Sequence, residues 1–221
     1  MHTMDRKGIF ITFEGVDKAG KSTQIRLLKE RLEGQGITVA CTREPGGTRL
    51  GETLRDIVMQ FRDERMAPEA ELMLFSASRA QLLRQFVWPE LAAGHAVLCD
   101  RFADSTTAYQ GYARGMDLEF IKALNDYTLA GRWPDLTILL DLDARQGFSR
   151  LHRVQAESGA GNDRFEDEGT AFQERVRQGF LEIARQNPSR VAVVAAARPI
   201  EEVAADVWRH VAAKLEGRAW S

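Results

Sequence analysis

The sequence contains little cysteine: only Cys41 and Cys99 occur in 221 residues. A small secreted domain held together by disulfide bonds is therefore excluded, because such domains are rich in cysteine. The two cysteines do not form a CxxC pair, and each lies in an apolar, strand-like run. We therefore expect two buried, reduced thiols in a protein of a reducing compartment.

Long apolar runs and an excess of one charge are missing as well. The apolar stretch at 9–13 ends at Glu14, which is too short for a secretory signal, and no run reaches the ~20 apolar residues of a membrane span. The net charge is −2, from 30 basic and 32 acidic residues, without a basic tail. General binding to nucleic acid or to an anionic membrane is therefore not expected. We expect a cytoplasmic protein.

Short β-branched runs alternate with longer helical patterns along the chain. This alternation is typical of an α/β fold, in which helices cover a parallel sheet. The length suits one domain over residues 1–221. A polar, glycine-containing stretch at 152–169 interrupts a helical region, and its composition predicts a mobile surface segment at about 150–169. The five expected strands are 8–13, 37–42, 96–100, 136–141 and 190–195.

The strongest motif is GVDKAGKS at residues 15–22, which matches GxxxxGKS. It directly follows the first expected strand and opens a helix, as a phosphate-binding P-loop does. Lys21 would bridge the β- and γ-phosphates of ATP, and the Ser22 hydroxyl would ligate Mg²⁺. A glycine turn with a surface lysine is the alternative, but it does not explain this setting. We therefore expect a P-loop NTPase-type, doubly wound five-stranded sheet. The residues predicted to bind ATP here are Gly15, Val16, Asp17, Lys18, Ala19, Gly20, Lys21, Ser22 and Thr23.

Three further clusters fall near the expected ends of strands, where a doubly wound sheet binds its ligands. They are TREPGGT at 42–48, DRF at 100–102 followed by STTAYQG at 105–111, and the helix residues Phe75 and Arg79. The last two are four residues apart and share one helix face, where an aromatic ring and a guanidinium group suit a nucleobase. Taken singly, Phe75 fits a core residue and Arg79 a solvated arginine. Their joint placement favours a site for a second, acceptor nucleotide.

The P-loop and these clusters, in this order and spacing, closely resemble the bacterial thymidylate kinase family from Ile9 to about Val207. The resemblance implies that the γ-phosphoryl group of ATP is transferred to dTMP, giving dTDP and ADP for dTTP biosynthesis. It also implies that Phe75 stacks on thymine, that Arg79 reads its O4 edge and that Thr106 lies near its N3.

The same resemblance assigns the sugar, phosphate and metal contacts. Tyr109 would lie under the deoxyribose and Asp17 would take its 3′-hydroxyl. Arg43 and Arg101 would hold the dTMP phosphate, and Asp100 would help to hold Mg²⁺ through water. The residues predicted to bind dTMP are Asp17, Arg43, Pro45, Phe75, Arg79, Arg101, Ser105, Thr106, Tyr109 and Gln110.

The segment at 150–169 resembles the lid of this family. Arg150 would lie against adenine, together with residues 196–200, and the lid arginines would reach the transferred phosphoryl group. The family carries either a glycine-like residue or an arginine at position 18, where this chain has lysine, and we assign that lysine a secondary part. The residues predicted to act in catalysis are Lys21, Arg101, Arg153, Arg164 and Lys18. The resemblance also implies a homodimer, with the helix at 68–93 as its interface.

Two other functions fit the P-loop. The first is a kinase of the same fold that phosphorylates another nucleoside monophosphate or a deoxynucleoside. A deoxynucleoside kinase needs a base for the 5′-hydroxyl, but it does not need several phosphate-binding arginines. The second is a nucleotide-dependent switch protein, which hydrolyses ATP whether or not an acceptor is present.

Overall fold

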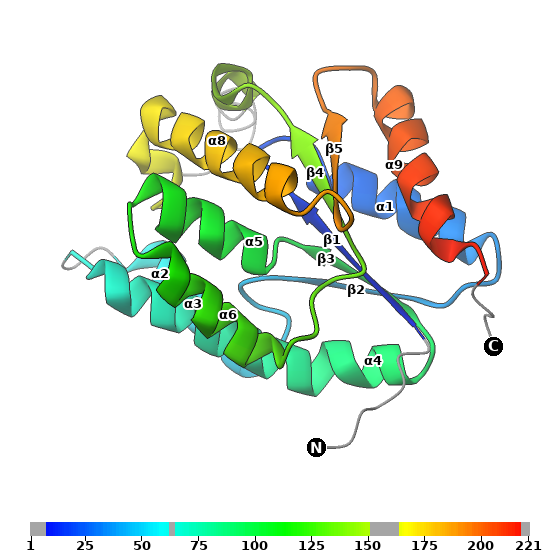
Figure 1. The fold of residues 1–221 in the computed structure, drawn as a ribbon, viewed down its shortest axis with the longest axis horizontal. Coiled ribbons are helices and arrows are strands. Elements are labelled where there is room, and N and C mark those ends of the chain that lie inside the picture. The colour runs from blue at the N-terminus through cyan, green and yellow to red at the C-terminus, as the bar shows by residue number, and fades with distance from the viewer. Residues whose placement is uncertain (1–7, 62–64, 151–163, 218–221) are drawn as a thin grey trace.

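The computed structural model describes residues 8–61, 65–150 and 164–217. Five parallel strands form one sheet in the order β2-β3-β1-β4-β5 (Figure 1). All five predicted strands are confirmed, and their ends differ from the prediction by no more than two residues. The strands are β1 (Ile9–Glu14), β2 (Val39–Arg43), β3 (Ala96–Asp100), β4 (Leu136–Asp141) and β5 (Val191–Ala195).

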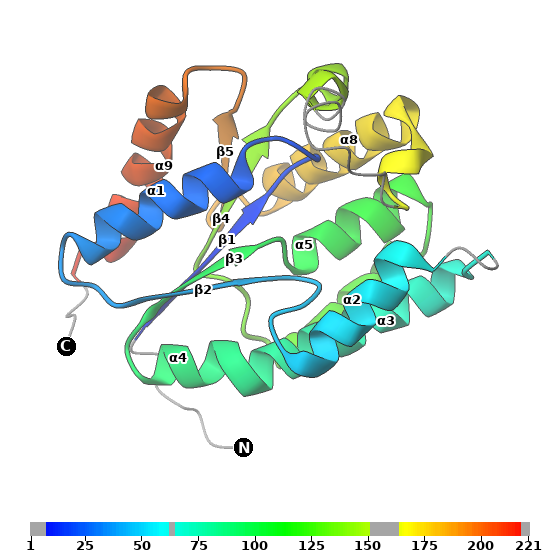
Figure 2. The same cartoon turned by 180° about the vertical axis from the view of Figure 1, so that it is seen from behind.

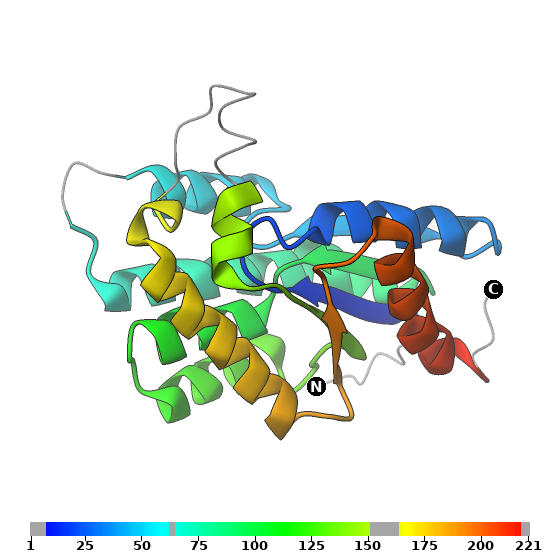
Figure 3. The ribbon, with the colours of Figure 1, turned by 90° about the horizontal axis from the view of Figure 1, so that it is seen from above.

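Helices cover both faces of the sheet. On one face α1 (Lys21–Glu33) and α9 (Ile200–Leu215) lie side by side (Figure 2). Figure 3, seen from above, places these two helices toward one end of the molecule and α8 toward the other. The remaining helices are α2 (Arg49–Gln60), α3 (Pro68–Leu82), α4 (Trp88–Ala92), α5 (Ala103–Thr106), α6 (Leu118–Leu129) and α8 (Thr170–Gln186), with a short helix at 144–150. The π-helical turns η1 (Leu83–Val87) and η2 (Thr107–Ala113) continue α3 and α5.

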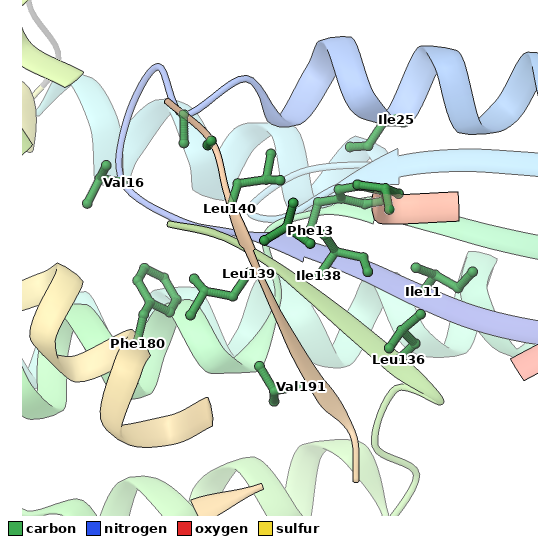
Figure 4. Close-up of a cluster of buried hydrophobic side chains, with 14 of the residues drawn as sticks. Ile11, Phe13, Val16, Ile25, Leu136, Ile138, Leu139, Leu140, Phe180 and Val191 are labelled. Carbon is green, nitrogen blue, oxygen red and sulfur yellow. The ribbon is translucent and has the colours of Figure 1, made fainter. Parts of the chain in front are cut away.

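The central strand β1 is buried on both faces, which explains its almost continuous apolar sequence. Phe13 belongs to the cluster that includes Ile25 of α1. Phe10, three residues earlier, points to the opposite face of the sheet and packs with Leu91 of α4. Figure 4 shows Ile25 on one side of the strands and Phe180 of α8 on the other. Each such side chain contributes about 1.5–3 kcal/mol when it is fully buried, so the strands that carry the site are firmly anchored.

The strand order places the candidate site. Because β1 lies between β3 and β4, the segments that leave the carboxyl ends of these strands open a crevice above β1. The P-loop follows β1, and the backbone N–H of Arg101, just after β3, donates to Phe13 O at 2.9 Å. The GxxxxGKS and DRF motifs are therefore neighbours in space.

The expectation of two buried thiols is confirmed for Cys99 and wrong for Cys41, which is exposed. Cys99 lies in β3, which has a paired strand on each side, whereas Cys41 lies in β2 at the edge of the sheet. The alternating burial along β2 leaves the Cys41 side chain in solvent. Within the three described ranges, every helix is too short or too polar to span a bilayer.

Candidate active site

The P-loop occupies the turn between β1 and α1. Gly15 has φ 137°, and a Cβ atom at this position would lie 2.5 Å from the Leu140 carbonyl oxygen, so the close approach of loop and sheet requires glycine. The Lys21 ammonium group donates to Val16 O at 3.1 Å and to Gly15 O at 3.3 Å, inside the loop. Burial, assisted by the charge of Arg101, lowers the pKa of Lys21 to about 8. The predicted phosphate-binding lysine is therefore held within the loop rather than in solvent.

Ser22 and Asp100 meet at the first turn of α1. The Ser22 hydroxyl donates to Asp100 Oδ2 at 3.1 Å, which brings two hard oxygen atoms together beside Lys21. Mg²⁺ prefers such ligands, and it keeps several waters when few protein atoms bind it. The described residues contain no cluster of three or more acidic, histidine or cysteine side chains that would hold a metal alone. The pair therefore fits an ion that is shared with phosphates.

Arg101 lies at the centre of the site in a strained backbone conformation, with φ 66°. Its guanidinium group donates to Asp17 Oδ1 at 2.6 Å, to Gly15 O at 3.0 Å and to Ser105 Oγ at 3.3 Å. The guanidinium carbon also lies 5.2 Å from the centre of the Tyr109 ring. Arg101 thereby connects the P-loop to the turn after β3.

Charges around Arg101 are tightly balanced. Burial acts to raise the pKa of Asp17, but the charges of Arg101 and Lys21 hold it below its usual value. Burial likewise acts to lower the pKa of the Arg101 guanidinium, but Tyr109 and Asp17 raise it above its usual value. Asp17 is therefore ionised and Arg101 charged throughout the working pH range.

Glu14 is a structural member of the site that the sequence interpretation missed. Its carboxylate accepts hydrogen bonds from Phe102 N at 2.7 Å and from the Ser105 backbone N–H and hydroxyl at 3.2 and 2.6 Å. It thereby fixes the turn that carries Arg101. Burial, and then the nearby charge of Asp104, raises the pKa of Glu14 to about 8. A glutamate at the end of a buried strand, directly before the P-loop, is the signal that could have found it.

A pocket opens beside Arg101, and eight of the ten residues predicted to bind the acceptor line it. Its walls include three aromatic rings, with the Phe165 ring centre 5.9 Å from that of Phe75 and 5.7 Å from that of Tyr109. Four lining residues had no predicted role there, namely Glu44, Arg55, Met59 and Phe165. The predicted residues that line it are Asp17, Pro45, Phe75, Arg101, Ser105, Thr106, Tyr109 and Gln110.

The other two predicted acceptor residues do not line this pocket. Arg79 is fully buried behind its wall and donates to Glu44, Asn125 and Thr106 at 2.5–3.0 Å. It therefore contacts the pocket residues Glu44 and Thr106 directly, and its contact with a base stays a prediction. Arg43 is half-exposed and pairs with Glu52 on α2 at 2.8 Å.

Arg55 of α2 is the cation that sequence reasoning missed. It lines the pocket and donates to Pro45 O at 3.1 Å, so that the TREPGGT turn and α2 together bring a second arginine to the acceptor side. Thr48 caps α2 by accepting a hydrogen bond from Gly51 N at 2.9 Å, which fixes where the helix starts. The motif contains the signal for this cap, but the helix that follows it contains two arginines, Arg49 and Arg55, and the sequence alone does not say which of them faces the pocket.

The predicted lid falls mainly outside the described residues, and Arg153 lies among those that are not described. Arg150 donates to Lys18 O at 3.3 Å and to Ala196 O at 3.4 Å, so it joins the P-loop to the segment predicted to hold adenine. Arg164 forms an ion pair with Glu71 on α3 and donates to Val58 O at 2.9 Å. The Arg164 guanidinium group is thus directed toward α2 and α3.

Comparison with known proteins settles the family. The model of the family described as thymidylate kinase matches residues 13–207. The chain belongs to the thymidylate kinase family. It is 46% identical over 198 residues to the thymidylate kinase of Desulfosudis oleivorans, covering 89% of this chain and 92% of the relative. It is 45% identical over 212 residues to that of Magnetococcus marinus, covering 96% and 97%.

A solved member of the thymidylate kinase family shares the fold. The crystal structure of thymidylate kinase from Ehrlichia chaffeensis superposes with a TM-score of 0.75 at 35% identity and covers 92% of this chain and 98% of that one. The sheet and the helices that cover it are therefore the fold of a thymidylate kinase.

Proposed function

We propose that this chain transfers the γ-phosphoryl group of ATP to dTMP, giving dTDP and ADP. Membership of the thymidylate kinase family supports this reaction. The observation that carries it is the lining of the pocket, which combines the aromatic rings of Phe75, Tyr109 and Phe165 with Arg101, whose guanidinium group donates to the P-loop at Gly15 O. An acceptor whose base packs against these rings would thereby present its phosphate to Arg101 and to the donor phosphates.

In this mechanism the protein aligns two nucleotides and compensates charge. Lys21 would contact the donor phosphates, while Arg101 and Arg55 would bind the acceptor phosphate. Ser22 and Asp100 would hold Mg²⁺, which neutralises charge on the phosphate oxygens when it is bound. No general base is required, because a phosphate monoester already provides an anionic oxygen as the nucleophile.

The carboxylates that line the pocket favour a monophosphate over a nucleoside as acceptor. Glu44 accepts three hydrogen bonds from the guanidinium group of Arg79, and Asp17 is paired with Arg101. Both carboxylates are therefore bound to arginine side chains. A nucleoside kinase instead needs a carboxylate that is able to accept the proton of the 5′-hydroxyl. The two pocket arginines in turn suit a phosphate dianion.

An assay of ADP release tests this function. Purified protein would be incubated with Mg²⁺-ATP and, separately, dTMP, dUMP, dCMP, dGMP, AMP and thymidine. We expect rapid ADP release with dTMP, with dTDP formed in equal amount, and slow release with thymidine. ADP release that is the same with every acceptor and with none would instead identify a nucleotide-hydrolysing switch, and a preference for another acceptor would reassign the substrate.

Phe75→Ala should weaken dTMP binding by roughly 1–3 kcal/mol, which is the usual contribution of stacking between a base and an aromatic ring. The affinity for ATP should change little, because Phe75 lines the acceptor pocket and lies on α3, outside the P-loop. Calorimetric titration with each nucleotide measures both. Phe120→Ala on α6, where the ring is 49% exposed, serves as the control. An unchanged dTMP affinity in Phe75→Ala would show that this ring only packs in the core.

The catalytic cation is proposed to come from the lid. A lid arginine would contact the phosphoryl group in a site from which water is excluded, whereas Lys18 is a compact, hydrated charge on the P-loop. Arg153→Ala should therefore lower kcat on the order of 10²–10³-fold with little change in KM for dTMP. Lys18→Ala should lose clearly less. Steady-state kinetics of both variants decide the matter, and a larger loss at Lys18 would assign the cation to the P-loop.

Deprotonation of Lys21 should make kcat/KM for ATP fall at alkaline pH. Its pKa of about 8 means that the free enzyme loses the ammonium proton as the pH rises through this value. Because the charged form binds phosphate, kcat/KM for ATP should fall above about pH 8, by about tenfold per pH unit. A profile of kcat/KM for ATP from pH 7 to pH 10 measures it. A flat profile would mean that another group holds the phosphates.

A homodimer and a cytoplasmic location stay predictions of the sequence. The helical run that begins with α3 at Pro68 carries exposed Met73, and the adjacent α2 carries exposed Leu50 and Ile57. Met73 supports the proposed interface along 68–93, because a partner would remove it from water, and Leu50 and Ile57 would extend that interface onto α2. Light scattering in solution, which gives the mass of the particle, tests the assembly.

A further inference from the structure

Glu71 of α3 is a buried carboxylate that the proposed reaction does not use. Only 1% of the residue is exposed. It accepts hydrogen bonds from Gln110 Nε2 at 2.7 Å and from Arg114 Nε and Nη2 at 2.7 and 3.2 Å, and it also pairs with Arg164. One carboxylate therefore binds three side chains from two other segments of the chain.

Each of these partners is next to a wall of the acceptor pocket. Gln110 lines the pocket itself and follows Tyr109, and Arg164 precedes Phe165. Glu71 is also one helical turn before Phe75. Glu71 is thus linked to segments that carry the three aromatic rings, and its partners Gln110, Arg114 and Arg164 all lie outside the P-loop.

The position of Phe165 depends on Arg164, the preceding residue, which is bound to Glu71. The Arg164 backbone N–H donates to Met59 O at 3.3 Å and its Nε to Val58 O at 2.9 Å, while the terminal nitrogen pairs with Glu71. Arg164 is thereby fixed to α2 and α3 together, and Phe165 is 5% exposed against the other two rings. The Arg114 guanidinium group, also bound to Glu71, lies 5.6 Å from the centre of the Phe165 ring.

The charges make Glu71 the principal anion of this cluster. The side chains of Arg114 and Arg164 are 16% and 18% exposed, and Glu71 is bonded to both. Glu168, which is 33% exposed, pairs with Arg114 at 2.8 Å. Neutralising Glu71 would therefore leave a largely buried guanidinium group at Arg164 without its carboxylate, whereas neutralising Glu168 would leave that pair intact.

We propose that Glu71 is a positioning residue for the acceptor, which holds the Phe165 and Tyr109 walls of the pocket through Arg164 and Gln110. This inference rests on the proposed function, because it takes the pocket to be the dTMP site. Glu71 acts on how well the acceptor is bound and not on phosphoryl transfer itself. Its loss should therefore raise KM for dTMP while kcat and KM for ATP stay as they are.

Glu71→Gln tests the proposal, with Glu168→Gln as the matched control that removes one charge from the same cluster. We expect KM for dTMP to rise about tenfold in Glu71→Gln, since a hydrogen-bonded charge is lost, and to change less than about twofold in Glu168→Gln. Equal effects in the two variants would overturn the proposal, as would a fall in kcat or a matching rise in KM for ATP.

A double variant shows whether Glu71 acts through the pocket wall. If it does, Glu71→Gln should raise the KM for dTMP of a Phe165→Ala variant by clearly less than tenfold, because one of the two walls that Glu71 positions is already gone. The proposal would be overturned if the two changes raised KM for dTMP independently, so that the increase in the double variant were the product of the two single increases. If Glu71→Gln fails to fold, Glu71→Asp keeps the charge but is too short to reach all three partners, and an unchanged KM for dTMP there overturns it as well.

The wild-type protein separates this inference from the proposed function. If the wild type does not phosphorylate dTMP, the proposed function fails. If the wild type does, and Glu71→Gln has no selective effect on KM for dTMP, only the role of Glu71 fails.

Discussion

Replacement of Lys21 by alanine should lower kcat on the order of 10³-fold or more. The Lys21 side chain is 7% exposed and its ammonium group lies within the P-loop, bonded to the carbonyl oxygens of Val16 and Gly15. Removing one preorganised donor at a site of developing charge usually costs about 10²–10³ in rate. Lys21 would in addition hold ATP in place before transfer, so the variant should both bind ATP more weakly and transfer its phosphoryl group more slowly.

The fold should survive this change, because the shape of the loop depends on its glycines and on the buried strand before it. Circular dichroism and a thermal melt check this, and a coupled assay of ADP release measures kcat. Lys29→Ala provides the control on the same helix, since that side chain is exposed and pairs only loosely with Glu33 at 3.8 Å. Undiminished formation of dTDP by Lys21→Ala would refute the assignment of the ATP site.

The parts of the structure that were predicted correctly depend on residues close together in the sequence. The P-loop is one continuous motif, and its strand–turn–helix setting follows from the residues on either side of it. The five strands could likewise be predicted, because each is a short apolar run between turns. Such local signals place Gly15, Lys21 and Ser22 without knowledge of the rest of the chain.

The parts that could not be predicted depend on contacts across the fold. The burial of Arg79 results from Glu44 and Asn125, which are 35 and 46 residues away from it. The exposure of Cys41 results from its strand lying at the sheet edge, which is a matter of strand order. The sequence alone does not distinguish a buried arginine of a helix from an exposed one, or an apolar strand in the middle of a sheet from one at its edge.

Family resemblance supplied the roles of single residues, but it did not say which of them would meet. Arg55 and Phe165 line the acceptor pocket without having been assigned to it, and Arg43 pairs with Glu52 instead. Arg55 lines the pocket where Arg43 was predicted to do so. The reason is that α2 begins between these two arginines and directs Arg55 back toward Pro45. The start of that helix therefore decides which cation faces the acceptor.

Replacement of Arg101 by alanine should lower kcat/KM for dTMP on the order of 10³-fold. Two effects combine in this change. The acceptor phosphate would lose a guanidinium group, which binds phosphate through two parallel hydrogen bonds. In addition, Asp17 would keep its negative charge beside the acceptor without the partner that now lies 2.6 Å away. An unpaired carboxylate at this position would repel the incoming phosphate dianion, so the loss should exceed that of a single hydrogen bond.

Two further variants separate these effects. Arg101→Lys keeps a positive charge near Asp17 but removes the planar fork, so its loss in kcat/KM should be smaller than that of the alanine variant. Arg101→Ala combined with Asp17→Asn removes the repelling charge, and it should recover part of the lost efficiency if the unpaired carboxylate is responsible. Because Arg101 also donates to Gly15 O, KM for ATP should rise modestly in all three proteins. An alanine variant that keeps its efficiency with dTMP would show that Arg101 only holds the P-loop to the turn after β3, and Arg55 would then be the cation that binds the acceptor phosphate.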